Sequence, residues 1–248
     1  LLNVSCSIIK NRLRDIGLQS FEVSANTTQK TIDITFTDKV DVNEILQLIT
    51  SKGKIGFYET YNRLDVIKLL EKEDKLFSIL NIPLENSEID NSSAILGYCK
   101  LQYKSQVDSY ISKYYVSKPD QGIKYLWSES ANKDGNYFLY LLKHQAAMDK
   151  SQILETVVVK QPDKTDHSDL MINFNNNGAL VWQNLSKNNI GKPIAMVVDN
   201  VVYCAPKLME EINNGKAIIS GNFSIKEITH LKSLIDNGEL PLEFRLKE

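Results

Sequence analysis

The spacing of apolar residues near the N-terminus constrains the fold more than any other feature, because it predicts the order α-β-β-α-β for residues 3–61. Apolar residues first recur at helical spacing as far as Gly17, a residue type that commonly ends helices. They then alternate with polar residues over 21–36 around a polar turn, which predicts a β-hairpin. The spacing of apolar residues changes in the same way over residues 41–61, which predicts a helix that ends at Gly53 and then one further strand.

The C-terminal end of the chain predicts one more helix and one more strand. Ser224 and Glu227 have the spacing of a capping box, in which each side chain satisfies a free backbone donor of the other residue. A helical apolar stripe follows and ends at Gly238. Beyond Pro241, residues 242–246 alternate between apolar and polar side chains, as a strand with one buried face does.

The two ends together predict the fold class. An α-β-β-α-β segment and an α-β segment complete a ferredoxin-like layer of helices on an antiparallel sheet, provided that the middle of the chain is an insertion. We therefore expect an α+β protein in which residues 1–61 and 220–248 form a ferredoxin-like base lobe. Residues 62–219 are then an inserted α+β head lobe.

The middle of the chain mixes helical and strand patterns. We expect helices at 64–80, 105–115 and 177–185, and strands at 94–101, 123–128, 137–142, 156–160, 170–174, 194–198 and 201–204. Asp199 and Asn200 separate the last two strands, and both residue types tolerate the positive φ of a tight hairpin turn.

Charge and hydropathy exclude some classes of function. The 29 basic and 31 acidic residues give a net charge of −2, so no overall basic field attracts nucleic acid. Apolar runs are only a few residues long, far below the roughly 18 that a membrane span needs. The chain opens at Leu1, with neither an initiator Met nor a signal segment, so we expect a piece of a longer protein.

Residues suited to catalysis or metal binding are scattered. The three histidines and three cysteines have no ligand spacing, so we expect no metal, no cofactor and no catalytic residue. Cys204 lies in a predicted strand and is interpreted as a core residue, although sequence alone leaves a nucleophile paired with a distant histidine open. A bridge between Cys99 and Cys204 is the less favoured interpretation of those two thiols.

Several segments, taken in order, resemble the first large periplasmic domain of the SecD family. The resemblance is carried by residues 190–200, by Ala205-Pro206, and by residues 219–224, followed by the helix that ends with Gly238-Glu239-Leu240-Pro241. Residues 9–17 and 54–57 are similar to the family's N-terminal helix and a following strand. Residues 62–165 match poorly and are interpreted as an enlarged head, of the kind that a fused SecDF carries.

The resemblance implies an auxiliary component of the Sec export machinery. A SecD-like protein is anchored in the bacterial inner membrane and works with SecF and the SecYEG channel, with this segment on the periplasmic side. Proton flow through the membrane part drives movements of the periplasmic domain, which engages and releases emerging preprotein weakly. No enzymatic activity and no nucleic-acid binding are implied.

The residues of interest carry the resemblance or lie at two expected hinge crossings, near residues 61–63 and 219–221. They are Arg12, Gly17, Tyr61, Arg63, Gly191, Pro193, Asp199, Ala205, Pro206, Gly221, Asn222, Phe223 and Pro241. We expect structural roles: Pro193 fixes φ before a strand, Gly221 permits a turn, and Asn222 or Ser224 caps the last helix. Phe223 is placed for a hydrophobic staple with Ile228.

Two alternatives come from other classes. One is an extracytoplasmic ligand- or peptide-binding module unrelated to export, which would show a deep pocket with convergent polar groups. The other is a hydrolase that uses Cys204, which would need a base within hydrogen-bond reach of the thiol.

Overall fold

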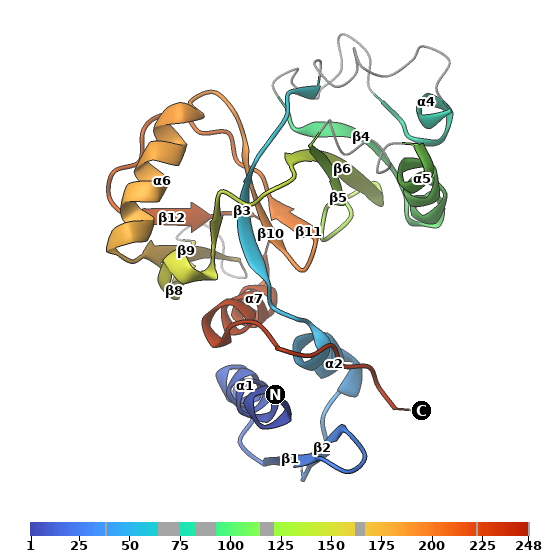
Figure 1. Cartoon of the computed structure of the whole chain (residues 1–248), viewed down its shortest axis with the longest axis vertical. Coiled ribbons are helices and arrows are strands. Elements are labelled where there is room, and N and C mark those ends of the chain that lie inside the picture. The colour runs from blue at the N-terminus through green and yellow to red at the C-terminus, as the bar shows by residue number, and fades with distance from the viewer. Residues whose placement is uncertain are drawn as a thin grey trace. The chain divides into compact units, whose positions relative to one another are not determined.

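The structure, a computed structural model, describes residues 1–37, 39–63, 75–82, 93–114, 122–161, 167–221 and 223–247. These residues form a mixed α and β fold with four sheets, and the chain divides into two compact units (Figure 1). Unit 1 consists of Leu1–Ile55, Lys150–Gly178 and Gly215–Glu248, and unit 2 of Gly56–Asp149 and Ala179–Asn214. The expected α+β class is confirmed.

The first elements of unit 1 follow the predicted order. Helix α1 spans Leu2–Asp15, strands β1 (Phe21–Asn26) and β2 (Thr31–Phe36) form an antiparallel hairpin, and helix α2 spans Val42–Thr50. Gly17 has φ +90°, which lets the chain turn out of α1 without steric cost. The Asp41 side chain accepts a hydrogen bond from the backbone N–H of Asn43 and so caps α2.

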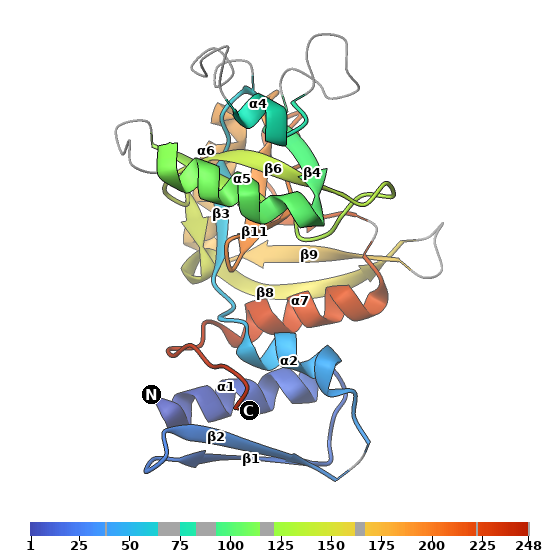
Figure 2. The ribbon, with the colours of Figure 1, turned by 90° about the vertical axis from the view of Figure 1, so that its right-hand side faces the viewer.

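The rest of unit 1 is a three-stranded antiparallel sheet and the last helix. The strand order is β12 (Lys216–Ile219), β9 (Ser168–Phe174) and β8 (Ile153–Lys160). Helix α7 (Ile225–Asn237) begins with the predicted capping box of Ser224 and Glu227 and packs between α1 and this sheet (Figure 2). Its buried stripe, Ile228, Leu231, Leu234 and Ile235, therefore faces other elements on both sides.

A cluster of apolar side chains in unit 1 joins α1 to the β1–β2 hairpin. Cys6, Ile9, Leu13, Val23, Ile45 and Leu240 form its buried core, and residues such as Ile32, Ile34 and Phe244 pack around it. The C-terminal segment thus contributes to the core of the N-terminal elements.

The predicted strand at residues 242–246 is wrong, because this segment is extended but belongs to no sheet. Phe244 packs against the cluster of α1, β1 and β2, whereas Leu246 is 64% exposed. Alternation supplies strand propensity, but a strand also needs a partner for its backbone, and β2 pairs with β1 alone among the described residues.

The single sheet expected from the two chain ends is also not formed among the described residues. Strand β3 (Ile55–Glu59) lies instead in a four-stranded sheet of order β11-β10-β3-β7, with β10 (Ile194–Val198), β11 (Val201–Cys204) and β7 (Met148–Asp149). Residues 55–58 of β3 are all buried, as in a central strand covered on both faces. Its continuous apolar character explains why it pairs within this larger sheet.

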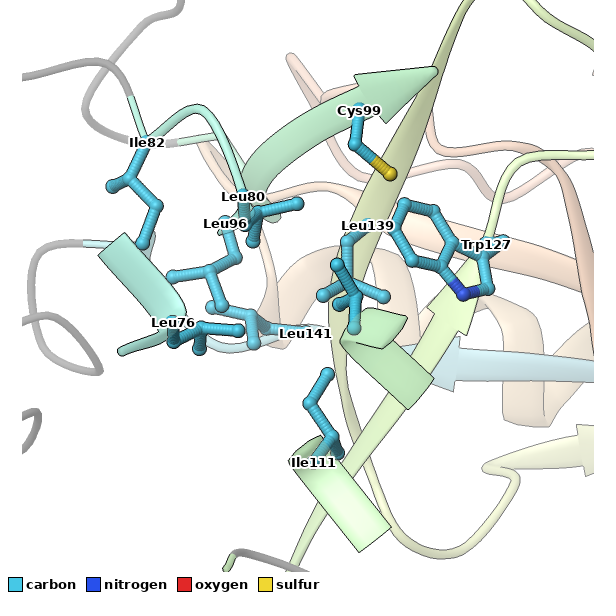
Figure 3. Close-up of a cluster of buried hydrophobic side chains, with 10 residues drawn as sticks. Leu76, Leu80, Ile82, Leu96, Cys99, Ile111, Trp127, Leu139 and Leu141 are labelled. Carbon is cyan, nitrogen blue, oxygen red and sulfur yellow. The ribbon is translucent and has the colours of Figure 1, made fainter. Parts of the chain in front are cut away.

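Unit 2 contains a further sheet of order β4-β6-β5, with β4 (Ile95–Lys100), β6 (Asn136–Lys143) and β5 (Ile123–Trp127). Helices α4 (Leu76–Ile79) and α5 (Leu101–Tyr114) pack on it through the cluster in Figure 3, to which Leu76, Ile111 and Trp127 belong. The Trp127 indole Nε1–H donates to the Asp108 carboxylate over 2.6 Å. Helix α5 is therefore held on this sheet by apolar packing and by the hydrogen bond between Trp127 and Asp108.

Most of the elements predicted for the middle of the chain are present. The strand at 94–101, both hairpins and the strands at 156–160 and 170–174 are confirmed, and helix α6 spans Asn176–Asn188 where 177–185 was expected. The short η2 turn at Lys150–Gln152 was not expected. Of the predicted helix at 64–80, residues 64–74 lie outside the described part of the chain.

The two units divide the chain differently from the predicted lobes. Both chain ends share unit 1, but residues 150–178 and 215–219 belong to it as well. The physical reason is the apolar stripe of α7, which needs cover on the side away from α1 and finds it in β8 and β9. Among the described residues, no helix has the length and apolar character needed to cross a bilayer.

Candidate functional site

The polar centre of unit 1 is Arg12, whose side chain is completely buried on α1. Its Nη1 donates to the carbonyls of Leu48 (3.0 Å) and Ser51 (2.5 Å), and its Nη2 donates to those of Lys52 (3.1 Å) and Gly238 (2.8 Å). We call Arg12 and these four carbonyls the Arg12 junction.

The junction forms because two helices end at the same place. Helix α2 ends at Thr50 and α7 at Asn237, and the carbonyls at a helix C-terminus lack intrahelical partners. Those carbonyls also carry the negative end of the helix dipole, which attracts a cation. A planar guanidinium with five donors can reach both ends at once, which the point-like ammonium of a lysine cannot do.

Gly53 makes room for the junction. Its φ is +80°, and a Cβ atom at this position would lie 2.4 Å from Arg12 Nη2 and 3.1 Å from the carbonyl oxygen of Gly238. Only glycine is compatible with both this backbone conformation and the approach of the guanidinium. The residue that ends α2 in the sequence is thus also part of the site.

Further hydrogen bonds surround the junction and connect the same three helices. The Ser233 hydroxyl donates to the Arg12 carbonyl (3.2 Å), and the Asn237 amide donates to the Asp15 carboxylate (2.6 Å). The Leu240 backbone N–H donates to the Lys52 carbonyl over 2.7 Å. α1, the end of α2 and the end of α7 are therefore joined at several points.

In unit 2, five predicted site residues belong to the β10–β11 hairpin, namely Gly191, Pro193, Asp199, Ala205 and Pro206. At its base, the Gly191 N–H donates to the Leu208 carbonyl (2.7 Å) and the Ile194 N–H donates to the Pro206 carbonyl (3.2 Å). At its tip, Asp199 and Asn200 have φ +51° and +66°. These residues shape the hairpin and bring no reactive groups together.

Tyr61 and Arg63 follow β3 in unit 2. The Tyr61 N–H donates to the Leu141 carbonyl (3.0 Å), the Arg63 N–H donates to the Ser93 carbonyl (3.2 Å), and the Arg63 side chain is buried. The segment is therefore bonded to β6 before residue 62 and to the residues that precede β4 after it.

Gly221 and Phe223 precede α7, while Asn222 lies outside the described residues. A Cβ atom on Gly221 would lie 2.6 Å from the Phe223 ring, so the glycine is needed for space. Gly221 is not among the residues with positive φ. The Ser224 side chain caps α7, and Pro241 is exposed at the start of the C-terminal segment.

One surface of unit 1 was missed by sequence reasoning. On the face of the β12-β9-β8 sheet opposite Thr156, Val157, Met171 and Ile218 are register partners and form an apolar row. Ile218 on edge strand β12 is 59% exposed, and Leu154 on the opposite edge strand β8 is 65% exposed. We call this surface the outer face. The burial of residues 216–219 alternates in the structure, but their sequence, Lys-Ala-Ile-Ile, does not alternate between polar and apolar side chains and so gives no signal of this face.

The thiols do not form a reactive site. All three cysteines are free, and burial raises the pKa of Cys204 to about 12 and that of Cys99 to about 11. A thiol with such a pKa is a poor nucleophile at neutral pH. Within the described ranges, no three His, Cys, Asp or Glu residues are grouped as metal ligands.

Comparison with known proteins finds similarity to one family. The model of the SecDF P1 head subdomain matches residues 125–242. The protein translocase subunits SecD of Leptotrichia buccalis and Rickettsia conorii are 34% and 31% identical over 47% and 46% of this chain. The matched segments span only 27% and 21% of those two relatives.

Two solved structures share the fold. A SecDF crystal structure in a super-membrane-facing form superposes on 100% of this chain and 27% of its own, with a TM-score of 0.58 and 16% identity. A second structure, described as a membrane component SecDF that enhances protein export, covers 98% of this chain and 89% of its own, with a TM-score of 0.53 and 15% identity. The mixed α and β architecture is thus that of the SecDF periplasmic domain.

Proposed function

We propose, from the premise that this chain is a periplasmic domain of the SecD/SecDF family, that it assists protein export through the Sec translocon. In this proposal it engages and releases preprotein as the polypeptide emerges. Movements driven by the proton-motive force in the membrane part of the protein power the cycle. The domain itself supplies binding and movement, and no catalytic group.

The location and partners belong to the same proposal. The domain lies on the periplasmic side of the bacterial inner membrane, and the full-length protein acts with SecF and the SecYEG channel. Base and head parts of the chain reorient during the cycle, since interfaces within one chain are commonly small and domain movement is the default expectation. The sequence places the hinge crossings near residues 61–63 and 219–221, whereas the chain passes between the two compact units at residues 55–56, 149–150, 178–179 and 214–215.

The observation that carries preprotein engagement is the outer face. A row of apolar side chains crosses three strands on one face of the sheet, and exposed apolar patches mark interaction sites. Lys216 and Glu155, exposed at the edges of the sheet, carry opposite charges. Such a surface binds extended chains of varied sequence, because it offers apolar contact without selecting one sign of charge.

The edges of the same sheet support this function. β8 and β12 each pair with β9 alone, so among the described residues their outer backbone groups bond to no further strand. An extended peptide can add to an open edge through main-chain hydrogen bonds, which do not depend on its side chains. Weak binding of this kind allows release, which a transport cycle requires.

Site-specific crosslinking tests the proposal. A photoreactive residue at Ile218 of the full-length protein should crosslink to a precursor arrested during export, and the same residue at Ser24, exposed on β1 of the same unit, should not. Ile218→Asp should slow export in cells, while Glu22→Lys on β1 should not. Equal crosslinking at both positions, or none at Ile218, would exclude the outer face as the contact surface.

The rival function, a ligand- or peptide-binding module unrelated to export, has one observation in its favour. A groove of about 510 Å³ in unit 1 is lined by β2, α2 and the C-terminal segment. Its lining is largely apolar, with Asp33 and Arg245 among the charged residues. A fluorescence-based thermal-shift screen against small metabolites separates the two functions, since only the rival predicts a saturable stabilisation by such ligands.

A further inference from the structure

The Arg12 junction connects the parts of the chain that lie nearest to its two ends. Arg12 is on the N-terminal helix, and Gly238 follows the last helix, 226 residues later in the sequence. In Figure 2, α1, α2 and α7 lie side by side, with the N-terminus at the start of α1 and the C-terminal segment passing over α2. A pull on the two chain ends therefore reaches this region of unit 1 first.

The bonds of the junction are arranged to share such a load. One rigid guanidinium makes all four hydrogen bonds, and its acceptors belong to two separate chain segments, 48–52 and 238. Because the donors sit on one planar group, separating α1 from the other two helices stretches several bonds together. Hydrogen bonds that involve a charged group are also stronger than neutral ones.

The surrounding contacts strengthen the same connection. Asn237 to Asp15 and Ser233 to the Arg12 carbonyl link α7 to α1, and Leu240 to Lys52 links the C-terminal segment to the end of α2. Leu240 is fully buried in the cluster of α1 and the hairpin. The chain is thus fastened on both sides of Gly238.

We propose that the Arg12 junction is a mechanical clamp, which keeps the N-terminal helix and the C-terminal segment together when force is applied to the chain ends. The clamp is a property of this chain alone. The role of the clamp in the cell rests on the proposed function, in which the membrane part of the protein moves the domain and so applies force to it. The crosslinking experiment above does not depend on the clamp, so either proposal can fail without the other.

Single-molecule pulling of the 248-residue chain at constant force tests the clamp. One geometry has handles at residues 1 and 248, and the other has handles at cysteines placed at Glu155 on β8 and Lys216 on β12. In the first geometry, Arg12→Lys should rupture at least about tenfold faster, because losing one charge-assisted hydrogen bond changes a rate by about that factor. In the second geometry its lifetime should stay unchanged.

Leu170→Ala is the matched control, since Leu170 is fully buried on β9 and its truncation weakens unit 1 while leaving the junction intact. We expect it to shorten the lifetime in the sheet geometry and to leave initial rupture in the terminal geometry close to that of the unaltered chain. If Arg12→Lys and Leu170→Ala have the same effect in both geometries, Arg12 only stabilises the fold and the clamp is refuted. An unchanged terminal-geometry lifetime for Arg12→Lys refutes it as well.

Discussion

The Arg12 junction in unit 1 and the β10–β11 hairpin in unit 2 both contain residues that resemble a known family, but they are held by opposite means. The hairpin is local: its strands are separated by Asp199 and Asn200 alone, and all five β10 residues are buried among apolar neighbours. The junction joins residues 12, 48–52 and 238 through a buried charge and backbone carbonyls. The hairpin is therefore determined by neighbouring residues in its turn, and the Arg12 junction by polar contacts between residues far apart in the sequence.

This difference predicts different responses to substitution. A hairpin whose strands are buried tolerates changes at its tip, because the apolar strands still specify the register. A junction built from one cation and four carbonyls has no substitute for the cation.

Arg12→Met should lower the free energy of unfolding by about 3 kcal/mol, because it leaves four carbonyls without their buried donor. Arg12→Lys should lose less, since an ammonium keeps the charge and some of the bonds. Urea denaturation monitored by circular dichroism measures both values. A loss below about 1 kcal/mol for Arg12→Met would mean that water replaces the guanidinium and that the junction resembles the hairpin in its tolerance.

Gly53→Ala should cost about 2 kcal/mol, from a side chain at φ +80° and from the approach of Arg12 Nη2 to 2.4 Å of the new Cβ. The two causes can be separated in an Arg12→Met background, where only the backbone strain remains. The double variant should therefore lose less than the sum of the single losses. Strict additivity would show that Gly53 and Arg12 act independently.

Sequence reasoning succeeded where the determining contacts are local. The capping box of Ser224 and Glu227, the helix end at Gly17 and the turn at Asp199-Asn200 were all predicted, because each depends on neighbours within a few residues. It failed for residues 242–246 and for the sheet of β3, because alternation reports strand propensity and not the identity of the partner strand. Pairing is decided by tertiary packing.

The residues of the candidate site were also predictable from the sequence only where their contacts are local. Arg12 was singled out only through the resemblance, and its acceptors are backbone carbonyls, which leave no trace in the side-chain sequence. The outer face was missed because the sequence predicts a strand at 156–160 without showing which of its faces is covered, and predicts no strand at residues 216–219. That decision depends on where α7 packs, which the sequence of one strand does not contain.

Alkaline pH should lower the free energy of unfolding by about 1 kcal/mol through Cys204, which lies on β11 of the hairpin. Burial raises the pKa of Cys204 from 9.0 to about 12, so the folded state holds this proton more tightly than the unfolded chain. The unfolded thiol ionises first, and the free energy of unfolding falls as the pH rises from about 9 toward 12. Denaturation curves at pH 8.5 and 10 should show a smaller fall for Cys204→Ala. An identical fall in both proteins would assign the effect to other groups.

The smallest expected effect is at the tip of the hairpin. Asn200 has φ +66°, which asparagine adopts at low cost and glycine at none. Asn200→Gly relieves that strain but also makes the unfolded chain more flexible, and these opposing terms leave a change below about 0.5 kcal/mol. Asn200→Ala relieves nothing and should cost about 1 kcal/mol, because alanine lacks the side-chain hydrogen bonding that makes positive φ accessible to asparagine. Thermal unfolding of the two variants in parallel measures the difference. If Asn200→Gly proves as costly as Asn200→Ala, the Asn200 side chain makes a contact that the hairpin needs, and the turn is then held by more than its backbone conformation.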